Sequence, residues 1–245
     1  EGGDKGISYE NLSLVFEEMN ELEKAVDYLD KAISFYETDG RIEKVLDLLM
    51  KEAEILTDLD KKETAIDKLK KGLNLEKRRG KRFWPFKSSD KMSSTQIQLH
   101  DRIADLSRGI DWEQCLKNRK EAIKGLKERN EDEAKQTLKY AFDLRDSGDE
   151  KEAVRVLNNI EEELGRKDIS EGVTAARLEK ARIFEDMGNY EKSENLLEEI
   201  IEDSEKRNDV KALKESSRLM NRVLKSMGRK KEAERFKDKF EGLSD

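Results

Sequence analysis

The sequence has very few of the residues on which most catalytic and metal sites depend. Its 245 residues include one cysteine, one histidine and one proline. A single cysteine excludes an intramolecular disulfide and is typical of a reducing compartment, so we expect a cytoplasmic location. The sequence also lacks an apolar run of about 18 residues, as a membrane-spanning helix would require, and lacks an opening signal-peptide pattern.

Recognisable catalytic motifs are missing as well. There is no GxxxxGK[ST], no GxGxxG and no GxSxG. A Cys–His nucleophile would have to combine His100 with Cys115 and would still need a third group to orient the histidine. Cys115 stands at a small-residue position of a repeat, where a buried and inert thiol is expected. Without clustered metal ligands, the sequence predicts no metal, no cofactor and no enzyme.

Charge is abundant and nearly balanced. Charged residues make up 44% of the chain, and 57 acidic against 50 basic side chains give a net charge of −7. The abundant Lys, Glu, Leu and Ala are strong helix formers, and the scarcity of proline favours long helices. The mildly acidic balance argues against a surface built for nucleic acid. We therefore expect an all-α protein of about twelve helices, each roughly 13 to 20 residues long.

Small and large apolar residues recur at intervals near 40 residues. Each copy contains one small residue, which we call the anchor residue. The anchor residues are Ala25, Ala65, Cys115, Ala153, Ser193 and Ala233. A large apolar residue, such as Leu56 or Leu144, stands nine positions before each anchor residue. Small residues let paired helices approach closely, and because one hairpin cannot bury its apolar face alone, successive hairpins must stack.

This spacing resembles the tetratricopeptide repeat family. The resemblance is carried by the sets Ala53/Leu56/Ala65/Leu69, Ala141/Leu144/Ala153/Leu157 and Ala181/Phe184/Ser193/Leu197. It covers nearly the whole chain as six repeats, with the long pitch of kinesin-light-chain-type members. The resemblance implies a right-handed solenoid of about six antiparallel helical hairpins in a single domain spanning 1–245. Because the chain begins at Glu1 rather than at Met, we expect it to be excised from a longer protein.

Some positions depart from this pattern. Arg119 in the third repeat and Lys237 in the last replace the leucine found elsewhere four residues after the anchor residue. The turns inside the last three hairpins contain Gly148, Gly188 and Gly228, since glycine adopts the left-handed conformation that ends a helix. Asp149 and Asn189 follow two of these glycines and are expected to cap the next helix.

One stretch, about 78–95, interrupts the repeats and is expected to form an insertion loop, since Pro85 cannot continue a helix. Basic and aromatic residues alternate within it. Its candidate contact residues are Arg82, Phe83, Trp84 and Phe86. The preferred interpretation is a plug between the second and third hairpins. A protein contact is the next alternative, and binding to nucleic acid or an anionic membrane is the least favoured.

The resemblance also implies a concave groove lined by the first helix of each hairpin. The predicted groove residues are Leu138, Phe142, Arg145, Leu178, Arg182, Arg218, Arg222 and Lys225. The first hairpin offers glutamates instead, so the groove is expected to be acidic at its N-terminal end and basic at its C-terminal end. Arg218 and Arg222 would hold the acidic portion of a peptide. The alternative is that these arginines only pair with Glu179, Glu215 and their neighbours.

These observations favour a protein–protein interaction scaffold or adaptor with a protein or peptide partner. The second hypothesis is a regulatory sensor domain, whose superhelix responds to a peptide or small ligand and controls an output partner. Both hypotheses are implied by the resemblance, because the residues themselves specify no reaction.

Overall fold

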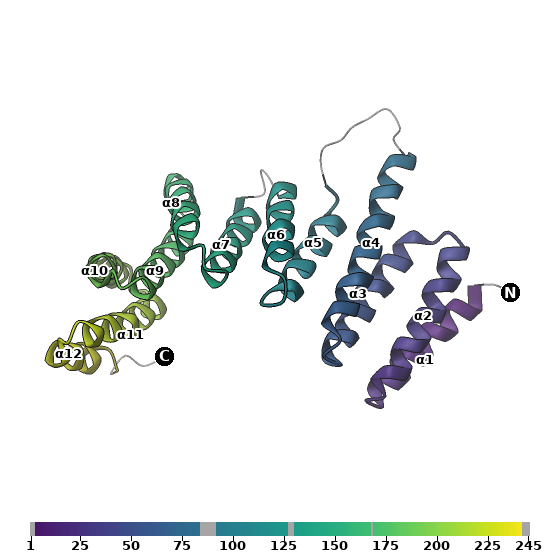
Figure 1. Cartoon of the computed structure of the whole chain (residues 1–245), viewed down its shortest axis with the longest axis horizontal. Coiled ribbons are helices and arrows are strands. Elements are labelled where there is room, and N and C mark those ends of the chain that lie inside the picture. Colours follow the sequence, from purple (N-terminus) through teal and green to yellow (C-terminus); the bar gives the residue numbers. More distant parts are fainter. Residues whose placement is uncertain (1–2, 84–91, 127–129, 168, 242–245) are drawn as a thin grey trace. The chain divides into compact units, whose positions relative to one another are not determined.

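The computed structural model describes residues 3–83, 92–126, 130–167 and 169–241. These residues form twelve α-helices and no strand, which confirms the all-α prediction (Figure 1). The first helices of the hairpins are α1 (Gly3–Glu18), α3 (Ile42–Asp58), α5 (Ser94–Ser107), α7 (Asn130–Asp146), α9 (Ser170–Asp186) and α11 (Val210–Ser226). The second helices are α2 (Leu22–Thr38), α4 (Lys62–Phe83), α6 (Trp112–Gly125), α8 (Glu150–Arg166), α10 (Tyr190–Arg207) and α12 (Lys230–Glu241).

The chain divides into two compact units. The N-terminal unit spans Glu1–Glu128 and contains α1 to α6, and the C-terminal unit spans Arg129–Asp245 and contains α7 to α12. Within each unit, consecutive helices pack against one another as stacked antiparallel hairpins. The predicted single domain stays a prediction, and each unit is described below by itself.

The anchor residues explain how closely the paired helices approach. All six lie on second helices, and all are completely buried. Where the anchor residue is Ser193, its hydroxyl donates a hydrogen bond to the carbonyl oxygen of Ala181 at 2.8 Å, across the α9–α10 pair. A small side chain at each anchor residue therefore leaves room for the facing backbone, as the repeat pattern predicts.

The turns inside the hairpins adopt the expected left-handed conformation. Gly148, Gly188 and Gly228 all have positive φ angles, from 73° to 89°. In the first two hairpins Asn20 and Asp60 take the same conformation. These two residue types tolerate a positive φ better than most, because their short polar side chains form local hydrogen bonds.

The two expected helix caps differ. The Asp149 side chain accepts a hydrogen bond from the backbone N–H of Glu152 at 3.3 Å, as an N-cap does. Asn189 occupies the N-cap position of α10, but its side chain makes no capping hydrogen bond. Helix α10 is stabilised instead by its packing against α9 and α11.

The insertion begins later than expected. Helix α4 continues through Phe83, so the residues from 78 to 83 are helical rather than part of a loop. Gly80 lies inside this helix, and the first helix-breaking residue is Pro85. Helix α5 starts after Ser93, whose side chain accepts from the N–H of Gln96 while the Gln96 side chain accepts from the N–H of Ser93.

Arg119 replaces a core leucine in the third hairpin and is almost completely buried, at 1% exposed. Its guanidinium forms ion pairs with Asp101 and Asp105 on the facing helix α5. A buried charge requires such partners, because its desolvation is otherwise uncompensated. The departure from the repeat pattern is therefore a buried ion-pair cluster within the α5–α6 hairpin.

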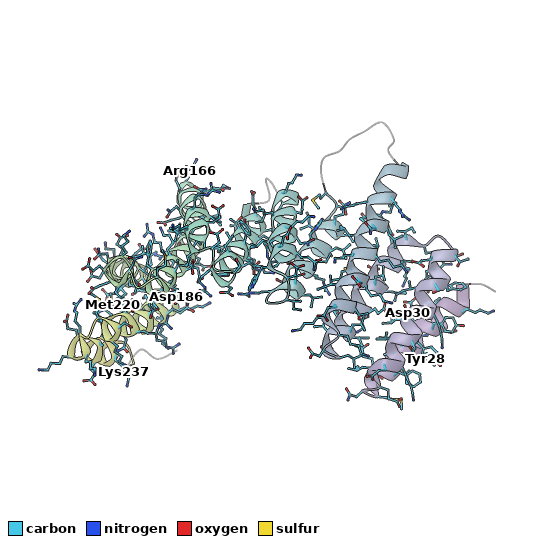
Figure 2. All side chains as sticks on the ribbon, viewed as in Figure 1. Tyr28, Asp30, Arg166, Asp186, Met220 and Lys237 are labelled. Atoms are coloured by element: carbon cyan, nitrogen blue, oxygen red, sulfur yellow. The ribbon has the colours of Figure 1, made fainter. Side chains whose placement is uncertain are left out.

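Charged side chains cover the outside of both units (Figure 2). Arg166, for example, lies at the exposed end of α8 and pairs with Glu162 one turn earlier. Among the described residues, no helix is long and apolar enough to cross a membrane.

Candidate functional site

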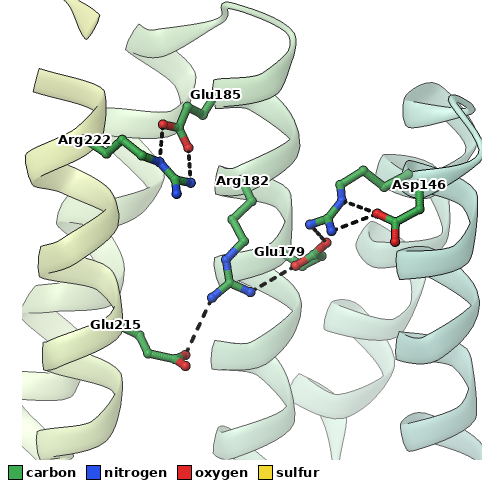
Figure 3. Close-up of polar contacts among 7 residues, drawn as sticks. Asp146, Glu179, Arg182, Glu185, Glu215 and Arg222 are labelled. Atoms are coloured by element: carbon green, nitrogen blue, oxygen red, sulfur yellow. Dashed lines mark hydrogen bonds and ion pairs between the residues drawn. The ribbon is translucent and has the colours of Figure 1, made fainter. Parts of the chain in front are cut away.

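Three first helices bring most of the predicted groove residues together in the C-terminal unit. Helix α7 packs against α9, and α9 packs against α11. Arg145 comes from the last turn of α7, Arg182 from α9 and Arg222 from α11. Figure 3 shows the three helices side by side with their charged side chains facing one another. We call this row of side chains the arginine strip.

Arg145 and Arg182 share the carboxylate of Glu179. Arg145 forms an ion pair with Glu179 and a second one with Asp146 at 2.9 Å. Arg182 donates to the other Glu179 oxygen at 3.2 Å and lies 4.0 Å from Glu215 on α11. Glu179 is only 1% exposed. One buried carboxylate therefore holds two guanidinium groups in fixed positions (Figure 3).

Burial raises the pKa of the Glu179 carboxyl above its ordinary value, and the positive charge of Arg145 with the hydrogen bond from Arg182 offsets only part of this effect. Burial acts to lower the pKa of Arg145, but the negative charges of Glu179 and Asp146 outweigh it and leave that pKa raised. Arg145 consequently keeps its positive charge at physiological pH.

Arg222 makes a two-pronged contact with Glu185. Its Nε and Nη2 atoms each donate to a different Glu185 oxygen at 2.5 Å. The Arg222 side chain is 62% exposed, whereas the Glu185 side chain is only 9% exposed. The hydrogen bonds to Glu185 raise the pKa of Arg222. Glu185 therefore fixes the orientation of the Arg222 guanidinium, while the side of the guanidinium that faces away from Glu185 remains open to solvent.

The arginine strip lines an open hollow of about 530 Å³. The residues around the hollow are Arg145, Asp146, Glu150, Arg182, Asp186 and Arg222. Its lining is mostly polar, which favours a charged or hydrogen-bonding occupant over an apolar one.

Arg218 and Lys225 extend the positive charge along α11. Both side chains are exposed, and neither forms an ion pair within the described part of the chain. With Arg222 they recur at positions i, i+4 and i+7, which places them on one face of the helix. These two residues are thus available for contact with an external anion without breaking an existing pair.

The predicted apolar groove residues differ in how deeply they are buried. Leu138 and Phe142 on α7 are half-buried. Leu178, by contrast, lies in the apolar core that contains Leu197, Met220 and Val223. At 5% exposed it takes part in the packing between hairpins, and its predicted contact with a ligand stays a prediction.

The glutamates of the first hairpin are also paired within the fold. Glu10 accepts hydrogen bonds from the Tyr36 hydroxyl and from Lys44. Glu17 accepts one from Lys51 at 2.6 Å. The acidic character expected for this end is thus partly neutralised by lysines of α3, and the polarity of one continuous groove stays a prediction.

The insertion residues lie mostly outside the described part of the chain. Trp84 and Phe86 fall between residues 83 and 92, and the structure describes only the backbone of Arg82 and Phe83, within α4. The plug, the protein contact and the alternatives to them therefore stay predictions.

The His100–Cys115 pair has the features expected of packing residues. His100 is buried, and its Nδ1 lies 2.7 Å from the Asn118 side-chain oxygen. Burial lowers the pKa of His100, which keeps it neutral. Cys115 is completely buried at its anchor position. Within the described residues, no group of three or more His, Cys, Asp or Glu side chains could hold a metal ion.

Several partners of the arginine strip were not predicted, among them Asp146 and Asp186. A spacing signal in the sequence nevertheless exists. Arg145 and Glu179 are 34 residues apart, and the same separation joins Lys44 to Glu10 in the other unit. Residues at this separation, which is slightly shorter than the repeat, lie on neighbouring first helices. Opposite charges at this separation therefore predict an ion pair between two hairpins.

Comparisons with known proteins agree with this architecture. Residues 7–39, which form the first hairpin, match the tetratricopeptide repeat family. The first hairpin is thus similar to a tetratricopeptide repeat. No protein with curated sequence annotation matches it. The resemblance stated from the sequence is thereby confirmed, and the tetratricopeptide fold accounts for the stacked hairpins of both units.

Solved structures share the tetratricopeptide fold at low sequence identity. A tetratricopeptide repeat protein from Parabacteroides merdae has a TM-score of 0.62 at 17% identity, covering 99% of this chain and 81% of that one. Repeats attributed to a kinesin light chain of Podosopora anserina reach 0.60 at 14% identity, with coverages of 78% and 90%.

A third structure belongs to a larger protein. It is a signal transduction ATPase with a tetratricopeptide repeat sensor, from Pyrococcus horikoshii. It has a TM-score of 0.68 at 15% identity, covering 98% of this chain but only 36% of that one. At these identities the three matches show the fold alone.

Proposed function

We propose that this chain is a non-catalytic protein-interaction scaffold that binds an acidic peptide segment of a partner along the arginine strip. The observation that carries the proposal is the alignment of guanidinium groups from three successive hairpins around one open hollow. Tetratricopeptide repeats present such first-helix surfaces at a fixed spacing, so one extended ligand would meet several hairpins.

The basic residues differ in whether they are available to bind a ligand. Arg145 and Arg182 are paired with Glu179 and its neighbours, so their charge is largely compensated and they are not free donors. Arg222 has an exposed outer face, and Arg218 and Lys225 are without ion pairs in the described chain. A ligand carboxylate would bind Arg218 directly and share Arg222 with Glu185, since guanidinium groups recognise carboxylates with two parallel hydrogen bonds.

A selection from a peptide-display library tests the proposal. The purified chain should enrich peptides with Asp or Glu at recurring positions. The Arg218→Glu/Arg222→Glu variant should lose this enrichment or favour Lys and Arg. Arg155→Glu is the matched control, because Arg155 is an exposed arginine on α8, outside the strip. Enrichment of the same peptides by the strip variant and the wild type would refute the proposed site.

A regulatory sensor is the second candidate. Its support is the fold shared with the sensor of the Pyrococcus horikoshii ATPase, which is a similarity of fold only. This hypothesis expects a bound peptide or small ligand to change the radius of gyration measured by small-angle scattering. The scaffold hypothesis expects binding without such a change.

A further inference from the structure

A small apolar pocket opens between the second and third hairpins of the N-terminal unit. Its volume is about 250 Å³, and residues of α3, α4 and α5 line it. Ala53 of α3 and Leu69 of α4 lie at its bottom, at 2% and 0% exposed, and Leu106 of α5 adds an apolar wall. Pockets for drug-sized ligands measure about 300–1,000 Å³, so this smaller one is suited to a single side chain.

The repeat pattern explains why this pocket is open. Asp105 of α5 lines it and lies ten residues before the anchor residue of its hairpin. The same position is Ile55 in α3, Ile183 in α9 and Val223 in α11, where the exposed fractions are 2%, 0% and 0%. The Asp105 side chain is 51% exposed, and its carboxylate forms an ion pair with Arg119. A carboxylate therefore stands where three other first helices bury an aliphatic side chain.

In other hairpins this aliphatic side chain joins the core of the preceding second helix. Ile55 belongs to the same apolar cluster as Leu29 of α2, and Val223 belongs to the same cluster as Leu197 of α10. Leu69 is the residue of α4 that corresponds to Leu29 and Leu197, since all three lie four residues after their anchor residues. The pocket thus lies where an aliphatic side chain would pack on Leu69, and a ligand with such a side chain would complete the repeat packing.

Acidic side chains surround the mouth of the pocket. Glu54 and Asp58 of α3 and Asp105 of α5 line it together with one cation, Arg102 of α5. Arg102 pairs with Glu54 at 2.6 Å. Asp58 is exposed and forms no ion pair with any described residue. The mouth therefore has an excess of negative charge, which favours a ligand with Lys or Arg beside its aliphatic side chain.

Neither the insertion nor a second copy of the chain matches this pocket. Leu69 precedes Phe83 by fourteen residues of α4, which is about 21 Å of helix. Trp84 and Phe86 follow Phe83 by one and three residues, and three residues span at most about 11 Å, so the length of the chain keeps both from Leu69. A second copy has the same net charge of −7 and would bring further negative charge to an acidic mouth. The charge of the pocket therefore favours a basic segment of another protein.

We propose that this pocket binds one Leu, Ile or Met side chain of a partner protein, within a segment that has Lys or Arg next to that residue. The aliphatic side chain packs on Ala53, Leu69 and Leu106, and the basic side chain pairs with Asp58. The pocket belongs to the N-terminal unit and selects positive charge, whereas the arginine strip belongs to the C-terminal unit and is proposed to select negative charge. The two sites are therefore independent.

Selection from a random library of 12-residue peptides displayed on phage tests this site. The wild type should enrich peptides that have Leu, Ile or Met within two positions of Lys or Arg. Thr57→Leu should abolish this enrichment, because Thr57 lines the pocket and the larger side chain fills it. Thr64→Leu is the matched control and should keep the enrichment, since Thr64 is an exposed threonine of α4 outside the pocket. Enrichment of acidic peptides should be the same in all three proteins, so a failure of the arginine strip would not affect the result.

The Thr57→Leu variant should fold as the wild type does. The Thr57 hydroxyl donates to the Ala53 carbonyl oxygen of its own helix at 2.7 Å, so its removal leaves no partner on another helix unpaired. Circular dichroism should therefore show the same helix content in both proteins. Absence of the aliphatic–basic class from the wild-type selection, or its undiminished enrichment by a folded Thr57→Leu chain, would overturn the proposal.

Titrations of one selected peptide by fluorescence anisotropy test the two parts of the site separately. Replacing the aliphatic residue of the peptide by Ser should weaken binding at least tenfold. Asp58→Lys should also weaken binding at least tenfold, and replacing the basic residue of the peptide by Glu should restore much of the affinity. Asp47→Lys, which changes an exposed aspartate of the same helix outside the pocket, should leave binding unchanged. Equal affinities of the Asp58→Lys and Asp47→Lys variants would contradict the proposed basic contact.

Sedimentation of the chain alone tests the alternative occupant. A monomer at every concentration supports a segment of a partner protein. A concentration-dependent dimer that Thr57→Leu abolishes would assign the pocket to a second copy of this chain, and would overturn the proposal in its stated form.

Discussion

Buried charges distinguish the interior of this protein at the scale of single residues. Glu52, Arg119 and Glu179 are almost completely buried, and each lies beside at least one side chain of opposite charge. Such groups are stable only while their partners remain, because an uncompensated buried charge costs several kcal/mol. Each one therefore has a measurable influence on stability that its size alone would not predict.

Arg119 gives the first prediction. Arg119→Ala should destabilise the chain by about 3 kcal/mol, because it removes the guanidinium between Asp101 and Asp105 and leaves a void. Arg119→Leu should cost much less, since four of the other hairpins have leucine at this position. Urea unfolding measures both changes. Equal losses in the two variants would contradict the view that leucine is an acceptable occupant.

Glu52 gives a prediction about pH. Burial raises its pKa to about 7, although the ion pair with Lys68 acts in the opposite direction. The unfolded state releases this proton at lower pH than the folded state does. Stability should therefore fall as the pH rises from about 4.5 to about 7, by an amount on the order of 3 kcal/mol.

The variant Glu52→Gln isolates this effect. At pH 4.5 it should match the wild type, and at pH 7.5 it should be the more stable protein, because its amide has no proton to lose. Urea unfolding at the two pH values measures the difference. A gap between variant and wild type that does not depend on pH would show that Glu52 titrates normally.

Helix ends and turns determine the behaviour at the scale of the elements. Five described glycines have positive φ angles, and Gly188 between α9 and α10 is one of them. Gly165 lies instead inside the last turn of α8, where a Cβ atom would meet nothing within 4 Å. The same substitution should therefore have opposite effects at these two sites.

Gly188→Ala should destabilise the protein by about 1 kcal/mol, because alanine is strained in the left-handed region. Gly165→Ala should stabilise it by about 0.5 kcal/mol, because alanine favours the helix and restricts the unfolded chain. Thermal unfolding of both variants measures the two shifts. Two shifts of the same sign would contradict the assigned conformations.

The repeat pattern predicts much of each element but not all of it. The anchor residues were identified from small side chains at fixed intervals, and all six are buried as expected. The extension of α4 through Phe83 is not predicted, because the interrupted repeat spacing and Pro85 place the insertion loop at about 78–95. Local composition gives the helices, whereas the point at which a helix ends depends on tertiary contacts.

At the scale of the whole molecule, the sequence predicts which charged residues share a surface better than it predicts which of them form ion pairs. The row of arginines follows from helical spacing and from the order of the hairpins. The burial of Glu179 and the two-pronged Arg222–Glu185 contact depend on how neighbouring first helices pack, and no single helix carries that information. Each of the two sequence hypotheses about the arginines describes part of the strip. Most of the arginines pair with carboxylates of the fold, whereas Arg218 forms no ion pair within the described chain.

Ionic strength gives a further prediction at this scale. Binding of an acidic peptide to the exposed Arg218, Arg222 and Lys225 should weaken about tenfold between 50 and 500 mM salt, because surface charges are screened over a few ångströms at high salt. Titrations of one selected peptide at several salt concentrations measure this dependence. Salt-independent affinity would indicate apolar recognition and would contradict the role of the arginine strip.

The most direct test of the central claim is a charge swap between Arg218 and a selected acidic peptide. Isothermal titration would compare the wild type with Arg218→Glu, against the peptide and against a copy in which one Asp or Glu is replaced by Lys. The account predicts that Arg218→Glu weakens the acidic peptide at least tenfold and that the Lys peptide restores much of the affinity. Equal affinities of the wild type and Arg218→Glu for the acidic peptide would contradict it.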